Sequence, residues 1–170
     1  MEKRNVTVSA IVAAIVLIGD QLSKHWAETW LRTNGEYKIW DGVLHLRYVE
    51  NRGAAFGMMQ GGEGVFLAIT GIACAAVLYF LIKERKRLHF MMTFSLALLL
   101  SGAIGNLIDR VALGYVRDMI YVALIDFAVF NVADMAVTVG CCLLVLDLLF
   151  FKGKKYMEMM DKKPQTGDNS

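Results

Sequence analysis

The stretch VFNVADMAVTVGCCLLVLDLLFF, residues 129–151, decides how this chain folds. Its length lies within the roughly 17–25 residues that a membrane-spanning helix needs. Two polar residues, Asn131 and Asp134, lie three apart near its start, so they share one face of the predicted helix. A carboxylate at membrane depth costs free energy and usually marks a functional site. Asp134 is therefore the first candidate functional residue.

Three further apolar runs have a similar length, at residues 6–23, 65–82 and 90–108. The chain of 170 residues is 56% hydrophobic and contains one proline, whereas soluble proteins are roughly 45–50% apolar even with glycine counted. We therefore predict an integral membrane α-helical protein with four transmembrane helices. Residues 1–151 should form a single membrane domain, and the polar tail 152–170 should be cytoplasmic and disordered.

Lysine and arginine are unevenly distributed between the predicted loops. The amino terminus, the 83–87 segment and the tail carry eleven of them, against six in segments 26–63 and 109–128. Because positive residues favour the cytoplasmic side, both termini should be cytoplasmic. The first run could instead be a signal peptide, but Asp20 interrupts its end and no small-residue cleavage site follows.

The first outer segment has strand-like composition. Its GVLHLRYVE stretch, residues 42–50, interleaves apolar and polar side chains, which is typical of a half-buried strand. We therefore predict a small β-sheet cradle on the outer membrane face, at about residues 36–60. Trp26, Trp30 and Trp40 flank it, as expected at a membrane interface.

Polar residues also fall at the outer ends of the first and third spans. Asp20 and Lys24 lie four apart, so on a helix they can form an ion pair. Asn106, Asp109 and Arg110 share one face of the third span, and the planar guanidinium of Arg110 suits carbonyl or carboxylate groups. From spacing alone, both groups could support a site or could be structural.

Three more acids lie on either side of Asp134 in the sequence. Asp118, in GYVRDMI, reads by itself as a loop acid paired with Arg117. Asp126 should be a solvated loop acid. Asp147 lies roughly 20 Å along the helix from Asp134, so it should pair near the cytoplasmic end and not join the same site.

Other chemistries lack their motifs. Cys74, Cys141 and Cys142 lie in apolar runs without metal-ligand spacing, and the three histidines show no HExxH-like pattern. The net charge of +2 gives no reason to expect a nucleic-acid partner. Carboxylate chemistry at the outer membrane face remains. It would suit an enzyme, a proton-coupled transporter or channel subunit with the acids as a relay, or a non-catalytic assembly factor.

Five blocks cover nearly the whole chain in order: DQLSK (20–24), ENRGAAFG (50–57), GAIGNLIDR (102–110), GYVRDMI (114–120) and FNVADMAVTVG (130–140). Together they resemble the lipoprotein signal peptidases, the bacterial signal peptidase II family. The resemblance implies an aspartic peptidase of the bacterial inner membrane that needs no metal or cofactor. Its substrates would be prolipoproteins whose lipobox cysteine carries a diacylglyceryl group, cut just before that cysteine. Cyclic peptides such as globomycin would inhibit it, and we expect it to act as a monomer.

By motif, the resemblance puts the two catalytic aspartates at Asp118 and Asp134. Two neighbouring carboxylates do not both ionise easily, so they share a proton. One can then take a proton from the attacking water while the other donates to the scissile carbonyl. The supporting or substrate-binding positions are Asp20, Lys24, Asn51, Asn106, Asp109, Arg110 and Asn131. Small residues at Gly102, Gly105 and Ala133 could line a groove for the signal-peptide helix.

Overall fold

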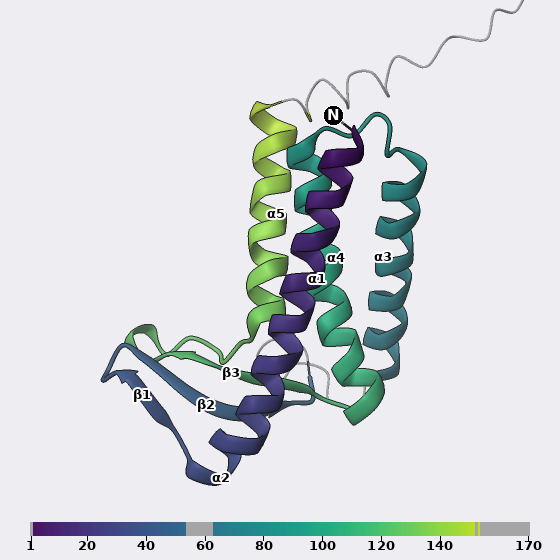
Figure 1. The fold of residues 1–170 in the computed structure, drawn as a ribbon. Coiled ribbons are helices and arrows are strands. Elements are labelled where there is room, and N and C mark those ends of the chain that lie inside the picture. Colours follow the sequence, from purple (N-terminus) through teal and green to yellow (C-terminus); the bar gives the residue numbers. More distant parts are fainter. Residues whose placement is uncertain (1, 54–62, 152, 154–170) are drawn as a thin grey trace, which may run out of the picture.

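The structure, a computed structural model, describes residues 2–53, 63–151 and 153. Four long helices stand side by side, and a small sheet extends sideways from one end of the bundle (Figure 1). The helices are α1 (Glu2–Trp26), α3 (Glu63–Lys83), α4 (Phe90–Leu113) and α5 (Val132–Phe150). The predicted fold class is confirmed.

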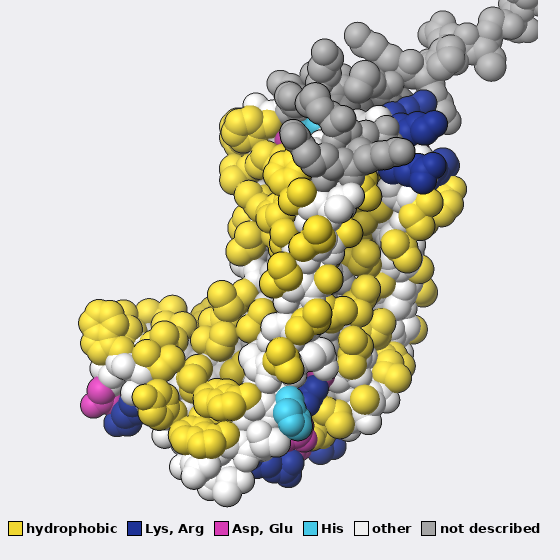
Figure 2. All heavy atoms as spheres, in the orientation of Figure 1, with side chains coloured by type: hydrophobic (Ala, Val, Ile, Leu, Met, Phe, Trp, Pro, Cys, Tyr) yellow, Lys and Arg dark blue, Asp and Glu magenta, His cyan; other side chains and the backbone are white. Residues whose placement is uncertain are grey.

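Length and hydropathy single out the same elements. In the part of the chain that the structure describes, three helical segments are long and apolar enough to cross a membrane: Asn5–Asn34, Phe90–Leu113 and Val132–Phe150. Residues Leu67–Lys83 of α3 form a shorter apolar helix. Figure 2 shows hydrophobic side chains over most of the visible flank of the bundle, with lysine and arginine near its ends. Such a flank suits burial in lipid.

The helix ends differ from the predicted spans for local reasons. After α1, a π-helical turn (Ala27–Leu31) and the short α2 (Arg32–Asn34) continue the helix beyond the membrane run. The central helix α4 runs five residues past residue 108 and ends at Gly114, whose φ of 79° is the left-handed conformation of a helix C-cap. α5 begins at Val132, because Asn131 caps it.

The central helix α4 packs against α1, α3 and α5, and its glycines permit the close approach to α5. A Cβ atom added to Gly102 would collide with the carbonyl oxygen of Ala133, and one on Gly105 would lie 2.6 Å from Asp20 Oδ2. All four residues are buried. The expectation that Gly102, Gly105 and Ala133 line a substrate groove is therefore wrong. They form the contact between helices, as small residues do in membrane bundles.

The sheet contains β1 (Tyr37–Trp40), β2 (Leu44–Asn51) and β3 (Val116–Val122), antiparallel in that order. The first two strands confirm the small β-sheet predicted at about residues 36–60, of which residues 54–60 lie outside the described residues. The third strand was not predicted, since GYVRDMI was interpreted as a loop. β3 follows α4 directly and brings Asp118 opposite Val49 of β2.

Candidate active site

Asp118 and Asp134 come from different elements and line one cavity of about 500 Å³. Asp118 lies on β3 and Asp134 lies in the first turn of α5. The polar side chains of Asn51 and Arg110 also line this cavity. The rest of its wall is mostly apolar and consists of Gly53, Phe127, Ala128, Val129, Phe130, Met135, Thr138 and Val139. The cavity therefore joins a polar end to an apolar wall.

The start of α5 fixes Asp134 by local hydrogen bonds. The Asn131 side chain accepts from the Asp134 backbone N–H at 2.9 Å, and the Asp134 carboxylate accepts from the Asn131 backbone N–H at 3.1 Å. This reciprocal capping box satisfies two backbone donors that a helix start leaves free. The positive end of the helix dipole also favours a carboxylate at this position.

Asn131 touches both acids. Its Nδ2 donates to Asp118 Oδ1 at 2.6 Å, while its backbone N–H serves Asp134. The second oxygen of Asp118 accepts from Asn51 Nδ2 at 3.0 Å, and the second oxygen of Asp134 accepts from Asn106 Nδ2 at 2.7 Å. Every one of these donors is a neutral amide. The two predicted catalytic residues and three predicted supporting asparagines thus form one hydrogen-bonded group.

The Asp118 carboxyl is almost completely buried, with 1% of the residue exposed. This burial raises the pKa of Asp118 to about 6, and the nearby Asp134 charge acts in the same direction, against the opposing hydrogen bonds from Asn51 and Asn131. The carboxyl therefore keeps its proton at a pH where an ordinary aspartate has lost it. A carboxyl of this kind can donate a proton near neutral pH.

A layer of buried charges lies behind the amides. Lys24 is fully buried, and its Nζ lies 2.8 Å from Asp20 Oδ2, which is the predicted ion pair. The same Nζ donates to Asn106 Oδ1 at 2.9 Å. The other oxygen of Asp20 accepts from the Ala133 backbone N–H at 2.9 Å, in the first turn of α5. Asp20 and Lys24 therefore support the site from behind, through Asn106 and the helix start.

Arg117 does not form its expected pair with Asp118. It pairs with Asp109 instead, at 2.8 Å between Nη2 and Oδ1 and 3.1 Å between Nε and Oδ2. Asp118 does not pair with Arg117, because neighbouring residues on a strand point to opposite faces of the sheet. Arg117 also binds Glu28 at 2.9 Å and Gln21 at 3.2 Å.

Sequence reasoning missed these contacts of Arg117, Gln21 and Glu28. The signal that could have revealed them is the run Val116–Val122, rich in β-branched and aromatic residues, which indicates a strand around the Arg–Asp pair.

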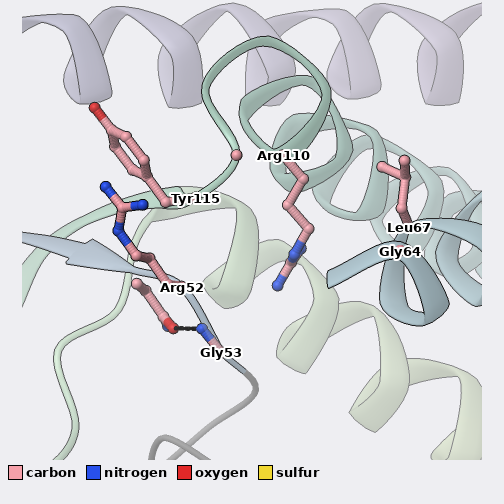
Figure 3. Close-up of a pocket in the computed structure, with 8 residues that line it drawn as sticks. Arg52, Gly53, Gly64, Leu67, Arg110 and Tyr115 are labelled. Atoms are coloured by element: carbon pink, nitrogen blue, oxygen red, sulfur yellow. Dashed lines mark hydrogen bonds between the residues drawn. The ribbon is translucent and has the colours of Figure 1, made fainter. Parts of the chain in front are cut away.

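Arg110 is half-buried and borders both the main cavity and a second one of about 190 Å³. Figure 3 shows its guanidinium extending from α4 toward Gly53, beside the dashed bond between the Gly53 N–H and Asn51 Oδ1. The full lining of the second cavity is Asn51, Arg52, Gly53, Gly64, Leu67, Arg110, Gly114 and Tyr115. Within the described residues, no hydrogen bond or ion pair occupies the Arg110 guanidinium. It is therefore available to a ligand.

The remaining acids of interest lie elsewhere. Asp126 is exposed and accepts a hydrogen bond from the Tyr121 hydroxyl at 2.6 Å. Asp147 is buried toward the opposite end of α5, where it binds His89 at 2.8 Å. Neither residue lines the main cavity. Among the residues described, no cluster of His, Cys, Asp and Glu could hold a metal ion.

The chain matches a protein-family model described as signal peptidase (SPase) II, over residues 12–150. The chain belongs to the signal peptidase II family. It is therefore a protease, and the resemblance read from the five sequence blocks is confirmed. Membership in a peptidase family favours the enzyme over the transporter, channel and assembly-factor alternatives.

Relatives in the signal peptidase II family share much of the sequence. A protein named lipoprotein signal peptidase from Streptococcus thermophilus (strain CNRZ 1066) is 45% identical over 142 residues, which cover 83% of this chain and 92% of the relative. A protein of the same name from Clostridioides difficile (strain 630) is 43% identical over 145 residues, which cover 85% of this chain and 97% of the relative.

Two solved structures have a similar fold, and both are titled as bacterial membrane enzymes. One has a TM-score of 0.77 at 32% identity and covers 95% of this chain and 94% of its own. The other has a TM-score of 0.76 at 34% identity and covers 85% of this chain and 94% of its own. Together with the apolar helices, these neighbours indicate a multi-pass membrane protein.

Proposed function

We propose that this peptidase removes the signal peptide from prolipoproteins whose lipobox cysteine carries a diacylglyceryl group, cutting just before that cysteine. The observation that carries the proposal is the meeting of Asp118 and Asp134 at the polar end of a mostly apolar cavity, where Asn131 contacts both. The family and the names of its relatives support the substrate class.

Asp118 and Asp134 would act as a proton-sharing pair. One carboxylate takes a proton from water as the water attacks the scissile carbonyl, and the other donates a proton to the carbonyl oxygen. The raised pKa of Asp118 suits it to hold a proton in one step of this cycle. Because one proton would be shared between the two carboxyl groups, the roles belong to the pair and not to single residues.

The apolar wall of the cavity suits a lipid-anchored substrate. Phe127, Phe130 and Met135 offer surface to an acyl chain or to the apolar signal peptide. Trp26 and Trp30 stack at 5.6 Å between ring centroids at the end of α1, and exposed tryptophans favour headgroup depth. A diacylglyceryl anchor would hold the scissile bond at that depth, beside the two acids.

Cleavage of a diacylglyceryl-modified lipobox peptide by the purified protein in detergent tests this proposal. The lipidated peptide should be cleaved before its cysteine, with a kcat/KM roughly tenfold or more above that of the unmodified peptide, because acyl chains bury apolar surface. The control for the cut position is a second lipidated peptide, in which the modified cysteine is displaced along the sequence and an alanine stands next to it. Equal rates for lipidated and unmodified peptides would contradict the anchoring argument.

Arg110 and Asn51 would bind backbone carbonyls of the substrate, and cyclic peptides such as globomycin would occupy the same cavity. Arg110→Lys should raise KM or weaken inhibitor binding by about tenfold, roughly one hydrogen bond to a charged group, because a point charge does not reproduce the planar fork. Arg32→Lys, at an exposed arginine paired with Glu50, is the control. If KM and inhibitor affinity are unchanged in Arg110→Lys, the role of Arg110 is structural only.

We further propose the bacterial inner membrane as the location, with both termini cytoplasmic and the site near the outer face. The amino terminus and the connection between α3 and α4 lie at the end of the bundle opposite the sheet (Figure 1). Single cysteines at 36–41 and at 83–88, in a chain with Cys74, Cys141 and Cys142 replaced, test this orientation. Reagent added outside intact cells should label the first group only, and labelling of the second would reverse the assignment.

A further inference from the structure

A continuous chain of buried charges joins the strand of Asp118 to the helix of Asp134. It begins with Arg117, next to Asp118, which pairs with Asp109 at 2.8 Å. Asp109 lies 3.6 Å from Lys24, and Lys24 lies 2.8 Å from Asp20. Asp20 then accepts from the backbone N–H of the residue just before Asp134. The two acids are thus connected through the framework as well as through Asn131.

Arg117 is held by several hydrogen bonds and ion pairs within this chain of charges. Its backbone N–H donates to Asp109 Oδ2 at 2.9 Å, so one carboxylate binds both its main chain and its guanidinium. The guanidinium also reaches Glu28 on the turn after α1. Asn131 Nδ2 lies 3.4 Å from the Arg117 carbonyl oxygen. The residue directly before Asp118 is therefore held by α4, by the turn after α1 and by the cap of α5.

We propose that Arg117 is a positioning residue that holds β3 where Asp118 can meet Asp134. The inference rests on the proposed dyad of Asp118 and Asp134. Arg117 itself does not line the cavity, since its side chain points to the face of β3 opposite Asp118. It therefore acts through the backbone of β3 and not by contact with substrate.

Charge balance supports a mechanical rather than an electrostatic role. Asp109 and Glu28 both face the guanidinium, and their hydrogen bonds raise the pKa of Arg117 further above its ordinary value. The positive charge is permanent and locally compensated. The largest influences on the pKa of Asp118 are its burial, Asn51, Asp134, Asn131 and Lys24. Loss of Arg117 should therefore move Asp118 and leave its direct partners in place.

The test compares kcat and KM per folded molecule for Arg117→Met, Arg117→Lys and Glu28→Gln on a diacylglyceryl lipobox peptide. The folded fraction comes from size-exclusion chromatography and thermal unfolding in detergent. Arg117→Met should lower kcat by about 10- to 100-fold with KM within about twofold, the size expected for a misplaced catalytic group. Arg117→Lys should recover part of the loss, because an ammonium can still pair with Asp109.

Glu28→Gln should lower kcat less than Arg117→Met, and the double variant should be no worse than Arg117→Met, because Glu28 acts through Arg117. Glu28→Gln keeps the buried Asp109 pair, so it gives a result even if Arg117→Met does not fold. Arg87→Gln, at an exposed arginine paired with Glu84, is the matched control and should match the wild type.

Two results would overturn the inference. Wild-type kcat per folded molecule in Arg117→Lys and Glu28→Gln, with only the yield or melting temperature reduced, would make Arg117 merely structural. A rise in KM at constant kcat would make it a substrate contact. Asp118→Asn is measured in parallel to separate the two proposals. If Asp118→Asn keeps its turnover, the dyad itself fails; if only the Arg117 and Glu28 variants keep theirs, the positioning role alone fails.

Discussion

Asp118→Asn and Asp134→Asn should each abolish cleavage of a lipidated substrate while leaving the protein folded. Asparagine is nearly isosteric with aspartate but can neither accept nor donate the proton of the acid–base cycle. General acid–base help is worth about 10²–10⁴-fold per group. A pair that acts as a unit loses most of its activity with either member gone, so the double variant should be little worse than either single one.

Asp126→Asn is the matched control for this prediction, because Asp126 is an exposed acid eight residues from each member of the pair. It should stay close to wild-type turnover. The assay is cleavage of a diacylglyceryl-modified peptide by purified variants matched for thermal stability. Near-normal turnover by either Asp118→Asn or Asp134→Asn would refute the dyad and leave the depth of Asp134 unexplained.

Lys24→Met should destabilise the protein strongly as well as inactivate it. Lys24 is fully buried between Asp20 and Asp109. Its removal leaves buried carboxylate charge without its cation, which costs about 3–5 kcal/mol in proteins where such a pair has been broken. Asn106 also loses one of the two donors that orient its amide toward Asp134, the other being Asn131 Nδ2 at 3.1 Å. Chemical unfolding in detergent and peptide cleavage measure the two effects.

A second substitution tests the cause of that loss. Adding Asp20→Asn to Lys24→Met removes the unpaired charge, so the double variant should regain part of the free energy of unfolding. Lys38→Met is the matched control, since Lys38 forms an exposed pair with Asp41 at 2.8 Å and should change stability little. If the double variant is no more stable than Lys24→Met, the lost stability comes from packing and not from buried charge.

The features that could be read from the sequence are those set by short spacings. The long apolar runs gave the helices, the i,i+4 spacing gave the Asp20–Lys24 pair, and the i,i+3 spacing placed Asn131 beside Asp134. The roles assigned to these residues from family motifs stay predictions. A single sequence is therefore enough to predict the features that local spacing determines.

The features that could not be predicted from the sequence depend on contacts between separate helices and strands. Asp109 can bind Arg117 because α4 ends at Gly114 and the chain turns there into β3. The strand around Asp118 was missed because two charged residues interrupt its apolar pattern. Each charge is buried on its own side of the sheet by partners from α1, α4 and α5, and those partners are distant in the sequence.

The amides around the acids are themselves oriented by other donors. The Asn131 oxygen accepts from a backbone N–H in α5, and the Asn106 oxygen accepts from the Lys24 ammonium. The Asn51 oxygen accepts from the Gly53 N–H. Each NH₂ group must therefore face a carboxylate, and none of these amides titrates between acid and neutral pH.

In the proposed cycle, this amide shell has no need to rotate or change charge while protons pass between water, substrate and the two acids. The reorganisation energy of each proton transfer in that cycle would be kept small, because the surrounding dipoles are already set before the reaction begins. The three asparagines would thus surround the carboxyl pair with fixed dipoles, whereas water would surround it with mobile ones.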